Sequence, residues 1–145
     1  MGAWGFGIME GDTPLDIECD IYKLFEIEQY DEDDNEVEIT ADIYEDNLDK
    51  FEDWFTCLDT DLNFLVLGVM MMEAGADIPR KFKDAMYEAC ESELDSVIDQ
   101  GWSEPEKRIR MLNDFNKKLQ NYKNQKIKFD TKGLLEIIYD GEKNV

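Results

Sequence analysis

The sequence DLNFLVLGVMMMEA, residues 61–74, carries polar side chains only at Asp61, Asn63 and Glu73. A helix that is apolar on all sides is typical of the buried centre of a globular protein. Asp59 and Thr60 precede the stretch as helix-capping residues, and Gly75 follows it as a helix end. Its uninterrupted apolar run, residues 64–72, is far shorter than the about 20 residues that span a bilayer. The stretch therefore predicts a helix at the centre of a soluble bundle.

Four segments around this helix have one apolar face each, at the spacing of amphipathic helices. They are expected to run from residue 12 to about 28, from about 40 to 58, from 79 to 101 and from about 106 to 122. The residues expected to face inward are Ile17, Ile21, Leu24 and Phe25 in the first, Tyr44, Leu48, Phe51, Phe55 and Leu58 in the second, Phe82, Met86, Cys90, Leu94 and Val97 in the third, and Ile109, Leu112, Phe115, Leu119 and Tyr122 in the fourth. In the last segment, Lys107, Arg108, Arg110, Lys117 and Lys118 are expected to face outward.

These segments predict a mainly α fold, a compact single-domain bundle of about five helices over residues 1–145. Residues 1–123 would form the helical core, including an acidic segment at 31–53, and residues 124–145 a C-terminal tail. Residues 126–129 alternate in polarity, and residues 134–139 are rich in β-branched and aromatic side chains. This favours a small β-hairpin in the tail. A short sixth helix is the alternative.

The charge of the chain is strongly negative and unevenly distributed. It has 36 acidic residues, 15 basic residues and no histidine, a net charge of −21. Residues 1–77 hold 23 acids and two bases, whereas residues 78–145 hold 13 of each. A field of this sign repels nucleic acid and anionic lipid. We therefore expect neither direct nucleic-acid binding nor membrane binding.

The acidic segment is the candidate binding site. Residues 31–38 form a loop too acidic to pack, and Asp42, Asp46, Asp49 and Asp53 follow at the three- and four-residue spacing that makes a row on a helix. The candidate partner-binding residues are Asp31, Asp33, Asp34, Glu36, Glu38, Asp42, Glu45, Asp46, Asp49, Glu52 and Asp53. Such a row would attract a cationic partner and accelerate its association. The alternative is a solvated helix face that only keeps the protein soluble.

The sequence gives little support for an enzyme, and we expect none. Without histidine, the usual general base and the serine–histidine and cysteine–histidine nucleophile pairs are missing. Cys19, Cys57 and Cys90 have no metal-binding spacing and are expected to be buried free thiols. Residues 31–42 begin like a calcium loop, but Glu36 replaces its glycine and Asp42 its final glutamate. No catalytic residue, cofactor or metal site is therefore predicted.

The opening MGAWGFG, residues 1–7, followed by Asp12, Thr13 and Asp16, resembles the start of the bacterial and phage family known as domain of unknown function 4259. The apolar helix followed by Ala74-Gly75 and Ile78-Pro79 is also similar, and the resemblance covers residues 1–122. It implies a compact, mostly helical domain, and no settled activity. The chain departs from the family pattern in the acidic insert at 31–38 and in the tail after Asn124.

These observations favour a non-catalytic, cytoplasmic protein that binds a basic protein partner. The hypothesis is an inhibitor, or an immunity or anti-defence protein, that engages a nuclease, another DNA-handling enzyme or a toxin by imitating nucleic acid. One alternative is a self-assembling structural protein, because residues 104–132 hold nine bases and four acids and could contact the acidic segment of a second copy. The other is a carboxylate- or metal-dependent enzyme.

Overall fold

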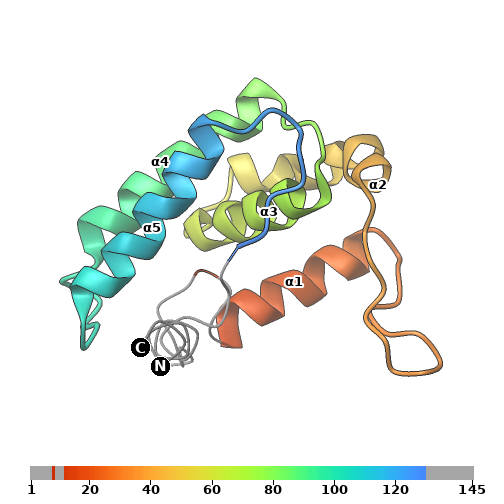
Figure 1. Ribbon diagram of the computed structural model, residues 1–145, viewed down its shortest axis with the longest axis horizontal. Coiled ribbons are helices and arrows are strands. Elements are labelled where there is room, and N and C mark those ends of the chain that lie inside the picture. Colours follow the sequence, from red (N-terminus) through yellow and green to blue (C-terminus); the bar gives the residue numbers. More distant parts are fainter. Residues whose placement is uncertain (1–7, 9–11, 130–145) are drawn as a thin grey trace, which may run out of the picture.

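A central helix, α3 (Asp61–Ala74), is packed among other helices in the computed structural model, which describes residue 8 and residues 12–129 (Figure 1). The other helical elements are α1 (Asp12–Leu24), α2 (Ala41–Asp46), the 3₁₀ helix η1 (Leu48–Phe55), α4 (Arg80–Ser96) and α5 (Pro105–Gln120). The described part of the chain is mainly helical and contains no β-strand, so the predicted fold class is confirmed.

The other helices are arranged around the buried helix α3. Every residue from Phe64 to Met72 is buried, and α1, α2, α4 and α5 all contact this helix. In Figure 1, α4 and α5 lie side by side against one side of α3 and α1 runs along another. The predicted bounds of this helix agree with the structure. Among the described residues, no helix is both long and apolar enough to cross a bilayer.

The C-terminal end of α3 is closed by segments from elsewhere in the chain. Gly75 adopts the left-handed conformation, with φ of 75°, and the Ala76 N–H reaches back to the Met71 carbonyl oxygen at 3.0 Å. The segment that follows α5 crosses this end, where the Ile127 N–H donates to the Met72 carbonyl oxygen at 2.9 Å. Carbonyl groups that a helix end leaves without partners are thereby satisfied inside the core.

The first and second predicted helices are shorter than expected. Helix α1 ends at Leu24 rather than near residue 28, and Glu26 turns the chain with φ of 58°. The predicted helix from 40 to 58 is divided at Asn47 into α2 and η1. Two hydrogen bonds mark this division: the Asn47 side-chain amide donates to the Ile43 carbonyl oxygen at 2.7 Å, and the Lys50 N–H donates to the Asn47 carbonyl oxygen at 3.0 Å.

Several predicted side-chain positions are wrong. Leu58 was expected to face inward but is 89% exposed, because the chain bends after η1. Cys57 in the same bend is exposed, Cys19 is half-buried, and of the three free thiols only Cys90 is buried as expected. Arg108 was expected to face outward but is 3% exposed, with its guanidinium carbon 4.7 Å from the centre of the Trp102 ring.

Most of the predicted tail lies outside the described residues. Residues 126–129 are described and form no strand, and Phe129 is buried against the core. The expected hairpin depends on residues 130–139, which the structure does not describe.

A close contact in the core gives a test of this packing. A Cβ atom on Gly68 would lie 2.8 Å from the Phe115 ring and 3.2 Å from the Met86 sulfur. We predict that Gly68→Ala lowers the free energy of unfolding by about 1–3 kcal/mol, because extra volume in a packed core forces its neighbours apart. Urea denaturation measures this loss.

The control is a double-mutant cycle with Phe115→Leu, which removes the ring that the new methyl group would meet. The effect of Gly68→Ala should be smaller in that background. Equal effects in both backgrounds would contradict the predicted contact.

Candidate functional site

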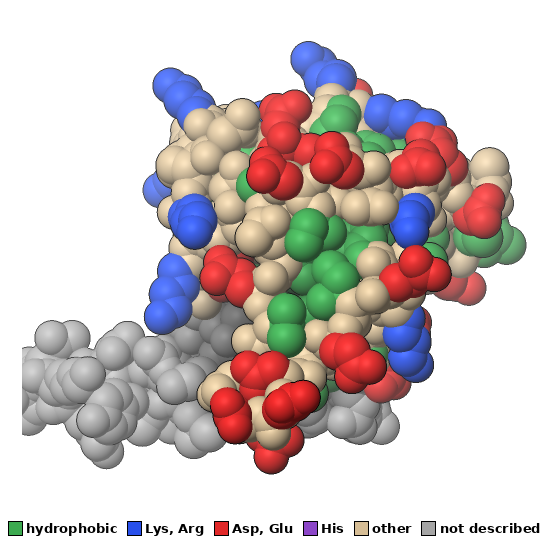
Figure 2. Space-filling model, turned by 90° about the vertical axis from the view of Figure 1, so that its right-hand side faces the viewer, with side chains coloured by type: hydrophobic (Ala, Val, Ile, Leu, Met, Phe, Trp, Pro, Cys, Tyr) green, Lys and Arg blue, Asp and Glu red, His purple; other side chains and the backbone are tan. Residues whose placement is uncertain are grey.

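All eleven candidate carboxylates predicted from the sequence are exposed. They belong to three consecutive parts of the chain, namely the loop between α1 and α2, helix α2 itself, and η1. Figure 2 shows the side of the molecule on which α2 and the loop lie. Acidic side chains lie above and below a strip of hydrophobic side chains there, and most basic side chains lie toward the edges. We call the eleven residues the acidic surface.

The predicted continuous row of carboxylates does not form on one regular helix. Asp42 and Asp46 lie on α2, whereas Asp49 and Asp53 lie on η1. Residues three apart are aligned in a 3₁₀ helix, so Asp53 is aligned with Lys50 rather than with Asp49. These four residues thus form two shorter groups, one on α2 and one on η1, which the break at Asn47 separates.

Five of the eleven carboxylates have partners within the chain. Glu52 pairs with Lys81 at 2.6 Å, and Glu38 lies 3.9 Å from Lys126. The other three accept hydrogen bonds: Glu45 from the Asp77 N–H, Asp31 from the Asp33 and Asn35 N–H groups, and Glu36 from the Tyr22 hydroxyl.

The other six carboxylates accept no hydrogen bond and form no ion pair with any described residue. They are Asp33, Asp34, Asp42, Asp46, Asp49 and Asp53. Within residues 31–53 the one basic residue is Lys50, and its ammonium group donates to the Leu24 carbonyl oxygen at 2.9 Å. The negative charge of this segment is therefore largely unneutralised by the described part of the chain.

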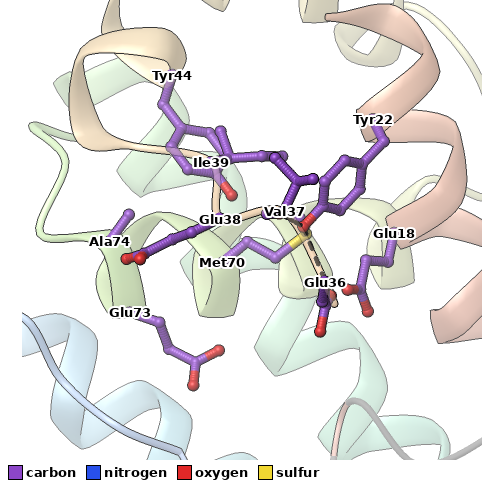
Figure 3. Close-up of a pocket in the computed structure, with 10 residues that line it drawn as sticks. All are labelled: Glu18, Tyr22, Glu36, Val37, Glu38, Ile39, Tyr44, Met70, Glu73 and Ala74. Carbon is purple, nitrogen blue, oxygen red and sulfur yellow. Dashed lines mark hydrogen bonds between the residues drawn. The ribbon is translucent and has the colours of Figure 1, made fainter. Parts of the chain in front are cut away.

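A pocket of about 230 Å³, which was not predicted from the sequence, lies beside the acidic surface (Figure 3). It combines four carboxylates with two tyrosines and apolar side chains. Its lining residues are Glu18, Tyr22, Glu36, Val37, Glu38, Ile39, Tyr44, Met70, Glu73 and Ala74. Helix α1 supplies the first two residues, the loop the next four, α2 supplies Tyr44, and the last turns of α3 supply the rest.

Tyr22 joins the loop to α1 inside this pocket. Its hydroxyl donates to the Val37 carbonyl oxygen at 2.6 Å and lies 3.5 Å from a carboxylate oxygen of Glu36. Glu18 is one turn before Tyr22 on α1, and its side chain lines the same pocket as that of Glu36. In Figure 3 the Glu18 and Glu36 side chains lie next to each other, while Glu73 approaches from α3.

The environment of Glu18 favours its protonated form. Burial raises the pKa of Glu18 to about 8, and the hydrogen bond to Glu36 and the negative charges of Glu36 and Glu73 act in the same direction. Burial also raises the pKa of Glu73, although the Phe129 N–H and the nearby Lys128 and Lys118 oppose this. Burial raises the pKa of Tyr22 and of Tyr44, so both remain hydroxyl donors at neutral pH.

The pocket is suited to holding a proton between carboxylates. Within the residues that the structure describes, no group of three or more acidic or cysteine side chains is arranged to bind a metal ion.

One signal for the pocket was present in the sequence, because Glu73 is the only acid in the last turns of an otherwise apolar helix. Glu18, one of 36 acids, carried no comparable signal.

Comparisons of the chain with family models, curated proteins and solved structures found no match. The resemblance to the domain of unknown function 4259 family therefore stays a prediction.

The contact between Tyr22 and the loop gives a second test. We predict that Tyr22→Phe lowers the free energy of unfolding by about 0.5–1.5 kcal/mol, because it removes a hydrogen bond to the Val37 carbonyl group. Tyr30→Phe is the matched control, since Tyr30 is 55% exposed. Thermal or urea denaturation compares the two variants, and equal stability of both with the wild type would contradict the role of Tyr22.

Proposed function

We propose that this chain is a non-catalytic protein that binds a basic protein through its acidic surface. It would act as an inhibitor or immunity-type protein on a nuclease, another DNA-handling enzyme or a toxin, by occupying the site that takes nucleic acid. The observation that carries this proposal is the set of six exposed carboxylates without partners among the described residues, namely Asp33, Asp34, Asp42, Asp46, Asp49 and Asp53.

The distribution of charge supports a binding role. Residues 78–145 contain 13 basic residues, yet the described ion pairs to the acidic surface are only those of Glu52 with Lys81 and Glu38 with Lys126. A surface that serves solubility alone works best with both signs mixed, because clustered like charges repel one another. A cationic partner would relieve this repulsion and be attracted over about 8 Å at physiological ionic strength.

Apolar side chains among the carboxylates support the same proposal. Tyr30 is exposed, and Val37 and Ile43 are half-buried within the segments that carry the acids. Protein–protein interfaces combine an apolar centre with a polar rim, and aromatic residues are enriched in them. A face with both features offers a protein partner short-range apolar contacts as well as long-range electrostatic attraction.

The test is a set of charge-neutralising substitutions in two places. The first variant carries Asp42→Asn, Asp46→Asn, Asp49→Asn and Asp53→Asn. The matched control carries Glu88→Gln, Glu91→Gln, Asp95→Asn and Asp99→Asn, four exposed acids in α4 and the turn after it, at the opposite end of the molecule from α2 (Figure 1). Both variants change the net charge by the same amount, so only the position of the charge differs.

Each protein is immobilised, exposed to host lysate at low salt and washed with rising salt. We predict that the wild type and the control retain the same basic nucleic-acid enzyme or toxin and that the first variant loses it. Because the contact is electrostatic, binding should fall steeply with salt, and duplex DNA should compete for the captured enzyme. Equal retention by both variants would mean that the acidic surface serves solubility only.

A further inference from the structure

The segment 29–38 between α1 and α2 carries five of the acidic-surface residues and meets α1 in the pocket. We propose that this segment is a pH-sensitive latch: it is held against α1 while Glu18 and Glu36 share a proton, and it is released when the pair loses that proton.

Hydrogen bonds within the segment hold it together as a unit. The Val37 N–H donates to the Gln29 carbonyl oxygen at 2.8 Å, and the Asp31 N–H donates to that of Asn35 at 2.9 Å. Tyr30 and Glu36 form an isolated antiparallel bridge. The exposed tip at 31–35 therefore moves with the base of the segment.

Among the described residues, the polar contacts between this unit and α1 are few and lie at its base. Tyr22 donates to the Val37 carbonyl oxygen at 2.6 Å, and the Cys19 thiol donates to the Gln29 side-chain oxygen at 3.0 Å. Tyr22 also donates to a carboxylate oxygen of Glu36 at 3.5 Å, and the Glu18 and Glu36 side chains lie next to each other in the pocket (Figure 3). Glu18, Cys19 and Tyr22 lie within about one turn of α1, so a change at Glu18 acts on the whole attachment.

The contact between Glu18 and Glu36 requires a proton. Two ionised carboxylates are both acceptors and repel each other, whereas one protonated carboxyl group donates to the other. The titratable groups that line the pocket with Glu18 are Tyr22 on its own helix, Glu36 and Glu38 on the segment, Tyr44 on α2 and Glu73 on α3. The nearby cations Lys118 and Lys128 act on Glu73, and Lys126 lies 3.9 Å from Glu38. The tyrosines stay neutral at neutral pH, and the other titratable groups that line the pocket are carboxylates. A second negative charge on the Glu18–Glu36 pair is therefore not compensated by a positive charge from the residues that line the pocket.

The direction of the pH dependence follows from the two states of Glu18. Its pKa is about 8 while the segment is in place and returns toward the ordinary 4.5 when the segment moves away. The closed state therefore binds the proton more tightly, and its population is greatest at low pH. As pH rises from about 4.5 to about 8, the ratio of closed to open molecules falls, by at most about tenfold per pH unit. The partial exposure of Glu18 makes the fall less steep, and above about pH 8 the ratio levels off.

Nuclear magnetic resonance on the isolated full chain tests this directly between pH 5 and 9, and no partner is needed. The titration of the Glu18 carboxyl carbon reports the proton, and nuclear Overhauser contacts between the Tyr22 ring and the Val37 methyl groups report closure. We expect Glu18 to titrate near pH 8 and the Tyr22–Val37 contacts to weaken over the same pH range.

Glu18→Gln supplies a neutral amide that can donate to the Glu36 carboxylate at any pH, so this variant should keep the Tyr22–Val37 contacts up to pH 9. Asp20→Asn is the matched control, because it makes the same charge change at an exposed position of α1 and should leave the pH response intact. If Glu18→Gln does not fold, Glu36→Gln places the neutral amide on the other member of the pair, in the segment, and should give the same result.

Titration of Glu18 near pH 4.5 would overturn the proposal. So would Tyr22–Val37 contacts that do not change while Glu18 titrates, or that still weaken in a folded glutamine variant. None of these results would bear on capture of a basic partner, so the proposed function and the latch fail independently.

Discussion

The constraint on which the structure depends is the nearly complete burial of α3. A helix with apolar side chains on all sides has to be covered on all sides, and α1, α2, α4 and α5 contribute to the cover. The segment after α5 closes its C-terminal end through Ile127. Glu73 lies in the last turn of α3, where a carboxylate needs access to water, and the pocket opens at this point. The position of the pocket is thus a consequence of how the central helix is covered.

The need to cover α3 also determines where the acidic residues lie. Residues 31–38 are too acidic to contribute to the cover of α3, so the chain between α1 and α2 projects as an exposed loop (Figure 1). Helix α2 and η1 bury Tyr44 and Phe51 against the core and therefore present their carboxylates to solvent. Because these segments are consecutive in the sequence, their charges gather on one side of the molecule.

The bounds of α3 were predictable because residues 64–72 are apolar without interruption, capping residues precede them and Gly75 ends the helix. The division at Asn47 was not, because Tyr44, Leu48 and Phe51 fit α-helical spacing and a change to 3₁₀ geometry equally well. Arg108 was misplaced because the ring of Trp102 covers its guanidinium group, a contact that helical periodicity does not reveal. Glu18 was missed because its pKa depends on burial in the folded chain and on Glu36 and Glu73, which lie far from it in the sequence.

The pocket influences the acidic surface by fixing the position of the loop, and not through charge alone. The exposed carboxylates of α2 and η1 are fixed by helices that pack on the core, whereas those of the loop are fixed by the attachment of the loop to α1. A cationic partner that contacts both groups at once needs them in one relative arrangement, because the free energy of a charge pair depends on distance. The proton between Glu18 and Glu36 adds little to the net charge of −21. By holding the loop, it would determine whether the two groups of carboxylates face a partner as one surface.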